Sequence, residues 1–414
     1  MRSSCPLWII LAGRKREERS MPEDRNIQRL REETAGCEQT AFFNNAGASL
    51  QPRSVVARVI EHLQLEERVG GYEAADLVAP EVAALYDSVA RLLHCAPEEI
   101  ALQENATRAW EMAFYSLPFS PGDRILTAAN EYASNYIAFL QVAQRTGAEI
   151  CVVESDQAGE IDLEALQRLL DDRVKLIART HVPTNGGLVQ PAAQVGVLAR
   201  RAGIPFLLDA CQSTGQMHLD VNALGCDMLC ATGRKYLRGP RGTGFLYVRR
   251  AMLEQMEPPL LDLRAATWVS AGKFEMRDDA KKFETWEAAA APRLGLGVAI
   301  EYALALGLDW IERRVQSLAT LLRERLADVK GVKVRDLGRL RCGIVTFTYE
   351  PHSAAEVMRW VKANGIAVRT IERSSTRIDM ERRGIDELVR ASVHYYNTEA
   401  ELERLCGVLR AMND

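Results

Sequence analysis

Short apolar segments alternate with helix-like segments through the middle of the chain, and this alternation limits the fold more than any other feature of the sequence. The apolar segments are residues 125–130 (ILTAAN), 149–155 (EICVVES), 174–180 (VKLIART) and 204–210 (IPFLLDA). Strands joined through helices pair in parallel and are covered by helices on both faces. We therefore predict an α/β domain with a mostly parallel sheet. A ligand would bind beyond the carboxyl ends of its strands, where Glu131, His181 and Asp209 fall.

Helical periodicity flanks this region. It predicts a helical stretch over residues 55–93, broken at Gly70 and Gly71, and a long helix over residues 294–308. The rest of the chain favours a smaller α/β domain with an antiparallel sheet, with strands at 332–337, 343–350 and 366–370 and helices at 354–363 and after Asn397. We predict an N-terminal segment of the small domain at 21–50, the large domain at 51–308 and the small domain at 309–414.

Residues 1–20 contain a short apolar run, CPLWIILAG, followed by basic residues. The run is too short to span a bilayer, and its charge follows the apolar part, whereas a secretory signal carries its charge first. We expect a disordered segment or an upstream extension here, with Met21 as an alternative start.

Composition narrows the class of protein. The chain has 414 residues, 47% of them apolar, which is enough for a large core divided between two or more domains. A net charge of -4 gives no reason to expect nucleic acid or an anionic membrane as a partner. The spacing of the nine cysteines matches no metal-binding motif, and such cysteines are typical of free thiols in a reducing cytoplasm. We expect a cytoplasmic protein with no metal.

Asp209 and Lys235 together indicate a cofactor. Asp209 closes an apolar strand, and Lys235 lies in a small-residue turn that leads into another apolar strand. Each alone has an ordinary interpretation, as a strand-end cap and as a surface charge. Together they are the two groups that pyridoxal 5'-phosphate (PLP) chemistry requires: an amine that forms the Schiff base and a carboxylate that keeps the pyridine nitrogen protonated.

Seven ordered segments carry a family resemblance: NNAGAS, ENATRAW, EYASN, HVPTNGG, LLDACQS, TGRKYLRGP and RASVHYYNTEAELERL. With them the chain resembles the class V aminotransferase-fold enzymes, which include cysteine desulfurases, C–S lyases and isopenicillin N epimerase-like proteins. The resemblance implies the aspartate-aminotransferase-like fold (fold type I), with a seven-stranded, mostly parallel sheet and a smaller C-terminal α/β domain. It also implies PLP as cofactor, an amino-acid substrate and a homodimer.

The same resemblance implies the roles of individual residues. Lys235 would form the Schiff base as the catalytic residue, Asp209 would bind the pyridine nitrogen, and Arg390 would clamp the substrate carboxylate together with Asn45. The other positions implied to bind the cofactor are Thr107, Arg108, Tyr132, Thr184, Asn185, Gln212, Thr232 and Arg234. Tyr132 would stack on the ring. For the contact near the ring oxygen, Thr184 and the adjacent Asn185 remain alternatives.

Two departures from the family pattern bear on activity. Ser374 stands at or near the place where desulfurases carry a reactive cysteine, and a serine cannot carry a persulfide. A desulfurase that forms a persulfide is therefore disfavoured. Trp286 and Glu287 occupy the segment in which relatives reach the partner subunit's phosphate, so that contact is in doubt. Residues 371–384 are either a substrate gate or a solvated surface segment.

Several functions remain open at this stage. We favour a lyase that cleaves C–S or another bond at Cβ by β-elimination, because this reaction needs neither a second substrate nor a second base. The alternatives in the same family are an amino-acid epimerase and an aminotransferase. An alternative of another class is a non-catalytic module that binds PLP. A nucleotide loop at GPRGTG is disfavoured, since its glycines precede a strand and not a helix.

Overall fold

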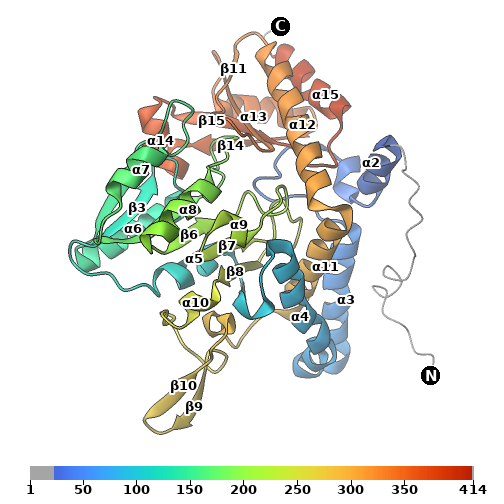
Figure 1. Ribbon diagram of the computed structural model, residues 1–414. Helices are drawn as coiled ribbons and strands as arrows, with labels where there is room; N and C mark the ends of the chain where they lie inside the picture. The colour runs from blue at the N-terminus through green and yellow to red at the C-terminus, as the bar shows by residue number, and fades with distance from the viewer. Residues whose placement is uncertain (1–22, 413–414) are drawn as a thin grey trace.

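The computed structural model describes residues 23–412, and the expected extension at 1–20 lies outside this range. Its larger part is built around a seven-stranded sheet (Figure 1). The strands are β2 (Ile100–Gln103), β3 (Arg124–Ala128), β4 (Glu149–Val153), β5 (Val174–Thr180), β6 (Phe206–Asp209), β7 (Met228–Thr232) and β8 (Gly244–Val248). Their order is β2-β8-β7-β6-β5-β3-β4, and β8 alone runs against its neighbours β2 and β7. The predicted fold type is confirmed.

Helices cover both faces of this sheet. They are α5 (Ala106–Phe114), α6 (Ala133–Thr146), α7 (Leu163–Leu169), α8 (Ala192–Ala202), α9 (Val221–Leu224) and α10 (Arg250–Leu253). Because successive strand residues point to opposite faces, Leu207 belongs to the same buried cluster as Phe139 of α6, whereas Leu208 belongs to the cluster that contains Val195 of α8. Full burial of each such side chain stabilises the fold by about 1.5–3 kcal/mol.

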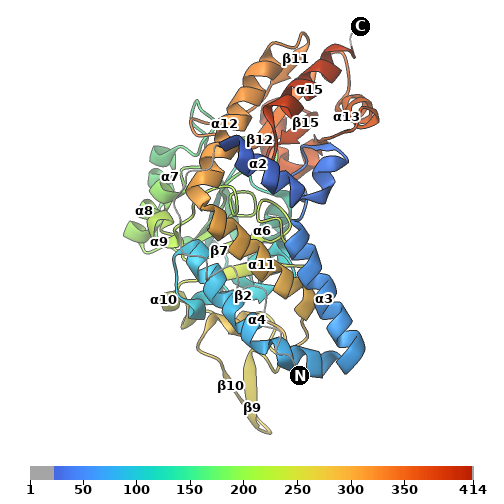
Figure 2. The same cartoon turned by 90° about the vertical axis from the view of Figure 1, so that its right-hand side faces the viewer.

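Long helices flank the sheet and lead to the second domain. The stretch predicted at 55–93 forms α3 (Arg53–Val69) and α4 (Gly71–Leu93), and the helix predicted at 294–308 is α11 (Ala290–Leu306). Gly70 separates α3 from α4 with a φ of 95°, a conformation that side chains rarely adopt. Gly307 does the same, with a φ of 87°, between α11 and α12 (Leu308–Ala327). Figure 2 shows α11 beside α3 and α4.

The C-terminal part has its own sheet. Its strands are β11 (Val332–Val334), β12 (Ile344–Tyr349), β14 (Arg369–Glu372) and β15 (Glu387–Ser392), and its further helices are α13 (Ala354–Ala363), η4 (Arg373–Thr376), α14 (Arg377–Arg382) and α15 (Glu399–Arg410). The order is β11-β12-β15-β14 and every pairing is antiparallel, as predicted. Sequence periodicity did not identify β15, which carries Arg390.

The N-terminal segment lies against the small domain. It comprises α2 (Glu23–Glu32), η1 (Ala35–Glu38) and β1 (Ala41–Phe42). Strand β1 pairs in parallel with β13 (Ile366–Ala367), and Arg31 lies 2.9 Å from the carboxylate of Glu401 on α15. Backbone pairing and an ion pair therefore join the two ends of the described chain.

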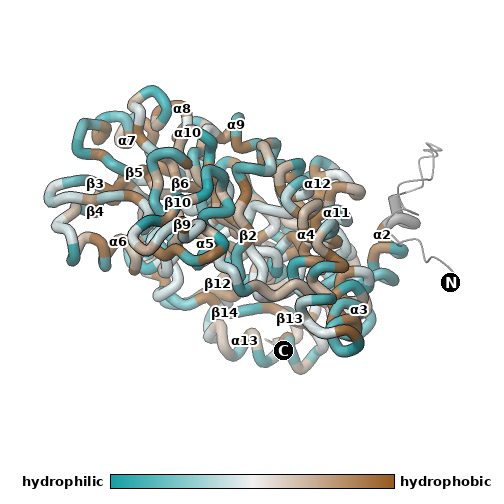
Figure 3. The backbone as a smooth tube through the Cα atoms, turned by 90° about the horizontal axis from the view of Figure 1, so that it is seen from below, coloured by the Kyte–Doolittle hydropathy of each residue, from teal (hydrophilic) through white to brown (hydrophobic). Residues whose placement is uncertain are grey.

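A two-stranded hairpin projects from the large domain. It consists of β9 (Ala266–Ser270) and β10 (Lys273–Met276), precedes η3 (Ala280–Phe283), and was not predicted. It extends away from the body in Figure 1 and points toward the viewer in Figure 3.

Between residues 23 and 412 no single helix is long and apolar enough to cross a bilayer; α11 and α12 pass that test only as a pair bent by 81°.

Candidate active site

The carboxyl ends of three neighbouring strands bring the predicted site residues together. Thr180, the last residue of β5, pairs with Asp209, the last residue of β6, and Asp209 pairs with Cys230 near the end of β7. Lys235 follows β7 in the turn before β8. This is the edge at which open parallel sheets bind ligands, as the sequence predicted.

Asp209 is buried and held in place by two donors. The amide of Asn135, on α6, donates to its Oδ2 at 3.0 Å, and the backbone N–H of Cys211 donates to its Oδ1 at 2.9 Å. Both contacts hold the carboxylate in place, and each oxygen retains a lone pair for a further donor. This is the arrangement that a protonated pyridine nitrogen requires.

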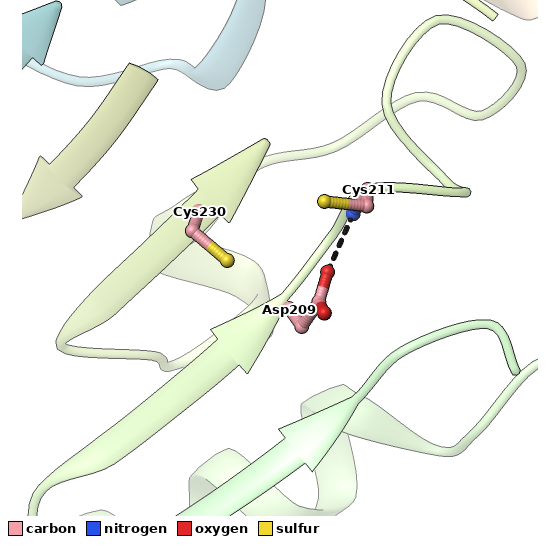
Figure 4. A group of neighbouring side chains, drawn as sticks. All are labelled: Asp209, Cys211 and Cys230. Atoms are coloured by element: carbon pink, nitrogen blue, oxygen red, sulfur yellow. Dashed lines mark hydrogen bonds between the residues drawn. The ribbon is translucent and has the colours of Figure 1, made fainter. Parts of the chain in front are cut away.

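Two thiols lie beside this carboxylate. The ligand atoms of Asp209, Cys211 and Cys230 all lie within 4.8 Å of one another, as Figure 4 shows. Metal binding requires thiolates, but burial raises the pKa of Cys230 well above its usual value. Both side chains are buried and the group supplies only three ligand atoms, fewer than the four of a structural zinc site; the absence of a metal stays a prediction.

Lys235 lies in an environment that favours its neutral amine. Burial is the main reason that the pKa of Lys235 is lowered. The positive charges of Arg234 and Arg390 lower this pKa further, while Cys211 and Asp209 partly oppose the shift. A lysine with a lowered pKa is a better nucleophile and base near neutral pH.

The N-terminus of α5 offers a site for a phosphate. Asn105 caps the helix by accepting a hydrogen bond from the backbone N–H of Arg108 at 2.9 Å, and Thr107 is exposed. Helix N-termini attract anions through their free N–H groups and the helix dipole. Gly244 of β8 approaches this terminus so closely that a Cβ atom there would lie 2.7 Å from the carbonyl carbon of Asn105.

Thr232 and Arg234, which the family resemblance implies as ligands of the cofactor phosphate, differ in their contacts. Thr232 is buried, and its hydroxyl donates to the carbonyl oxygen of Thr243 at 3.2 Å. The guanidinium of Arg234 donates to the carbonyl oxygen of Gly47 in the N-terminal segment. Phosphate binding by Arg234 therefore stays a prediction, and it would require this contact to be shared or exchanged.

Gln212 is buried with one amide atom free. Its Nε2 donates to the carbonyl oxygen of Ala46 at 3.1 Å, whereas its Oε1 has no hydrogen-bond partner among the described residues. A buried acceptor without a donor costs about 1–3 kcal/mol. A cofactor hydroxyl or N–H group would satisfy it. Together with Asp209, Lys235 and the α5 terminus, this orphan acceptor fits PLP.

Arg390 reaches the pocket from the small domain. It lies on β15, and its Nη1 donates to the hydroxyl of Thr184 at 2.6 Å and to the Thr184 carbonyl oxygen at 3.2 Å. Its Nε has no partner among residues 23–412. Burial lowers the pKa of Arg390 to about 10, so the guanidinium remains charged at neutral pH. A buried cation with a free donor suits a carboxylate.

The adjacent Thr184 and Asn185 have different partners, and which of them contacts the ring oxygen stays a prediction. Thr184 contacts Arg390, as described above, whereas the Asn185 amide donates to Asp379 Oδ2 at 2.7 Å and so faces α14. Asn45, predicted to bind substrate, is fully buried. Its Nδ2 donates to the Ser392 carbonyl oxygen at 2.7 Å and its Oδ1 accepts from Tyr396, so both amide atoms are engaged; its substrate role stays a prediction.

A buried network supports the pocket beneath Tyr132. Glu131 accepts hydrogen bonds from the backbone N–H of Thr180 at 2.9 Å and from Asn135 at 2.8 Å. Tyr132 itself is 36% exposed, and its backbone N–H donates to Glu131 at 3.1 Å. Sequence reasoning did not assign Asn135, although its position four residues after Glu131 was the available signal.

Comparisons with known proteins identify the family of the chain. The model of the family "Aminotransferase class-V" matches residues 41–405. A probable cysteine desulfurase of Xylella fastidiosa is 30% identical over 375 residues, 89% of each chain, and one of Pyrococcus abyssi is 27% identical over 400 residues, 95% of this chain and 98% of the relative. The apo structure of a cysteine desulfurase from Thermococcus onnurineus superposes with a TM-score of 0.87 at 27% identity, covering 95% of this chain and 98% of that one.

These matches define a PLP-dependent enzyme of fold type I. The chain belongs to the class V aminotransferase family. The predictions of PLP as cofactor and of a PLP-dependent lyase or transferase of this family are confirmed.

Proposed function

We propose that the chain cleaves the C–S bond of a cysteine-type amino acid by β-elimination and releases the sulfur directly. The proposal rests on one observation, that residue 374 is a serine. Relatives named cysteine desulfurase align with this chain over most of its length, yet Ser374 lies exposed in η4 at or near the position of the reactive cysteine. The substrate class follows from these relatives, and the direct release of sulfur follows from Ser374.

Each site residue has a separate role in the proposed reaction. Arg390 binds the substrate carboxylate, and Lys235, whose lowered pKa favours the neutral amine, removes the Cα proton. Bound PLP, held by Asp209, Gln212 and the α5 terminus, supplies the electron sink for the charge that develops at Cα. The electron pair of the Cβ–S bond leaves with sulfur. For cysteine the products are hydrogen sulfide and a dehydroamino acid, which water converts to pyruvate and ammonia.

No other described cysteine replaces the missing one in an obvious way. Cys211 interacts with Lys235 and Cys230 lies beside Cys211, but both are buried at the ends of β6 and β7. Sulfur transfer to an enzyme thiol requires a thiolate that can reach the substrate. Their burial supports release of sulfur to solvent.

Product analysis tests the proposal. The holoenzyme is incubated with cysteine and cystine, and the products are separated by mass spectrometry. We expect a keto acid and ammonia in equal amounts, with an equal amount of sulfide from cysteine or of cysteine persulfide from cystine. Alanine with a persulfide on the protein would overturn the proposal in favour of a desulfurase. Racemised substrate or aminated cofactor would identify the epimerase or the aminotransferase, and no turnover across a broad amino-acid panel would favour a binding module.

We also propose a homodimer. Val56, Ile60 and Leu63 form an exposed apolar stripe at helical spacing on α3, and Trp268 on the projecting hairpin is 72% exposed. Analytical ultracentrifugation should give twice the chain mass, and the double substitution Ile60→Glu and Leu63→Glu should shift it to the monomer. A monomeric wild type would refute the proposal.

The cytoplasmic location also stays a prediction, which cell fractionation tests.

A further inference from the structure

The turn that contains Thr184 and Asn185 belongs to the large domain but is held by the small domain. Arg390 donates to Thr184 at 2.6 Å, and the carbonyl oxygen of Asn185 lies 3.3 Å from the hydroxyl of Thr346 on β12, which also lies 2.7 Å from Asp336. The Asn185 side chain donates to Asp379 of α14 at 2.7 Å. The position of the turn, and of the arginine that contacts it, therefore depends on three elements of the small domain.

Asp379 is the link between α14 and this turn. Its carboxylate is only 14% exposed and also accepts a hydrogen bond from Arg383 at 3.1 Å. Its backbone N–H donates to the carbonyl oxygen of Ala129, beyond β3, at 3.0 Å. Asp379 thus fixes α14 against two large-domain segments, one of which leads to Tyr132. Hydrogen bonds to charged groups contribute more than neutral ones, about 1.5–3 kcal/mol.

Two other arginines of this segment, Arg373 and Arg377, form ion pairs away from Asp379. Arg373 pairs with Asp386, and Arg377 pairs with Glu381 at 2.9 Å on the exposed side of α14. A role for either arginine in recognising an acidic substrate would require these pairs to break. The charged group of this segment that faces the large-domain turn is Asp379.

We propose that Asp379 is a positioning residue for carboxylate recognition. Through Asn185 it fixes the turn that carries Thr184, and Thr184 in turn holds the Nη1 end of the Arg390 guanidinium, so that the Nε end is free to bind the substrate. Residues 371–384, which would carry the reactive cysteine in a desulfurase, form a fixed wall of the site. The inference rests on the proposed role of Arg390 in binding the substrate carboxylate.

Exchanging the amide of Asn185 and the carboxylate of Asp379 between the two positions tests the proposal. Asn185→Asp places a second carboxylate 2.7 Å from Asp379, so repulsion should displace the turn. We expect the Kd of the holoenzyme for cysteine and glycine, followed by the absorbance change of the bound cofactor, to rise about tenfold. KM should rise with it while kcat changes less. Adding Asp379→Asn restores a donor and an acceptor in reverse order and should recover most of the affinity.

Controls distinguish the possible failures. Glu381→Gln, on the exposed side of α14, should leave the affinity unchanged, and methylamine, which lacks a carboxylate, should bind every variant equally. If Asn185→Asp does not fold, Asp379→Ala replaces it and should weaken glycine binding by a similar factor. Unchanged glycine affinity in folded Asn185→Asp or Asp379→Ala, with Arg390→Lys impaired, would refute the positioning role alone. Unchanged affinity in Arg390→Lys would refute the proposed carboxylate clamp itself.

Discussion

Burial sets the charge of individual groups around the cofactor pocket. It lowers the pKa of Lys235, lowers that of Arg390 to about 10 and lowers that of His181 to about 4. Near neutral pH these shifts leave Arg390 charged and His181 neutral, and they favour the neutral form of Lys235. The same apolar surroundings thus provide both a base and a fixed cation within one pocket.

The state of His181 predicts how stability depends on pH. Burial, with a contribution from Arg179, lowers the pKa of His181 to about 4, compared with about 6.5 in the unfolded chain. Between these values the unfolded state binds more protons, so stability should fall as the pH falls from about 6.5 to 4, by at most about 3 kcal/mol. Urea unfolding of wild type and His181→Gln across this range measures the difference. Equal slopes in both proteins would contradict this prediction.

At the scale of elements, close approach of β8 to α5 shapes the phosphate site. Gly244→Ala would place a Cβ atom 2.7 Å from the backbone of Asn105 and 3.0 Å from that of Ala106. Overpacking of this kind costs about 1–3 kcal/mol, so we expect PLP to bind roughly tenfold more weakly. Equilibrium dialysis of the cofactor measures the effect. Gly407→Ala, whose Cβ would meet nothing within 4 Å, should leave PLP binding unchanged, and equal affinity in both variants would contradict the argument.

Most helices and strands were predictable from the sequence, because an element that buries one or two faces has apolar residues at regular intervals. Helix α13 and strand β5 match the predicted residues 354–363 and 174–180, and the helix break falls at Gly70. The hairpin β9–β10 was missed because its residues are mostly exposed and carry no such pattern. The chain positions of Asp209 and Lys235 revealed the cofactor. The partners of Asn45 and Asn185 could not be predicted, since they are set by contacts between distant segments.

At the scale of the whole molecule, Asp336 joins the two domains. One oxygen accepts a hydrogen bond from Arg323 at 2.7 Å, and the other accepts from the backbone N–H groups of Gly187 at 3.1 Å and Thr346 at 2.9 Å. Arg323 and Asp336 are almost completely buried. The pair therefore ties the large-domain turn beyond Asn185 to α12 and to the sheet of the small domain.

Removing one partner of this buried pair should be costly. Asp336→Ala leaves Arg323 without its carboxylate, so we expect the free energy of unfolding to fall by about 3–5 kcal/mol. Thermal melting and urea unfolding measure the loss. Asp278→Ala, which removes an exposed carboxylate, serves as control and should change stability by less than about 0.5 kcal/mol. Equal stability of the two variants would show that Asp336 does not hold the domains together.

The attachment of the cofactor tests the account most directly. The PLP-loaded protein is reduced with borohydride, digested and mapped by mass spectrometry. The account predicts one pyridoxyl label, on Lys235, and no label in Lys235→Ala loaded in the same way. A label on another lysine, or an unlabelled Lys235 in fully loaded protein, would contradict it.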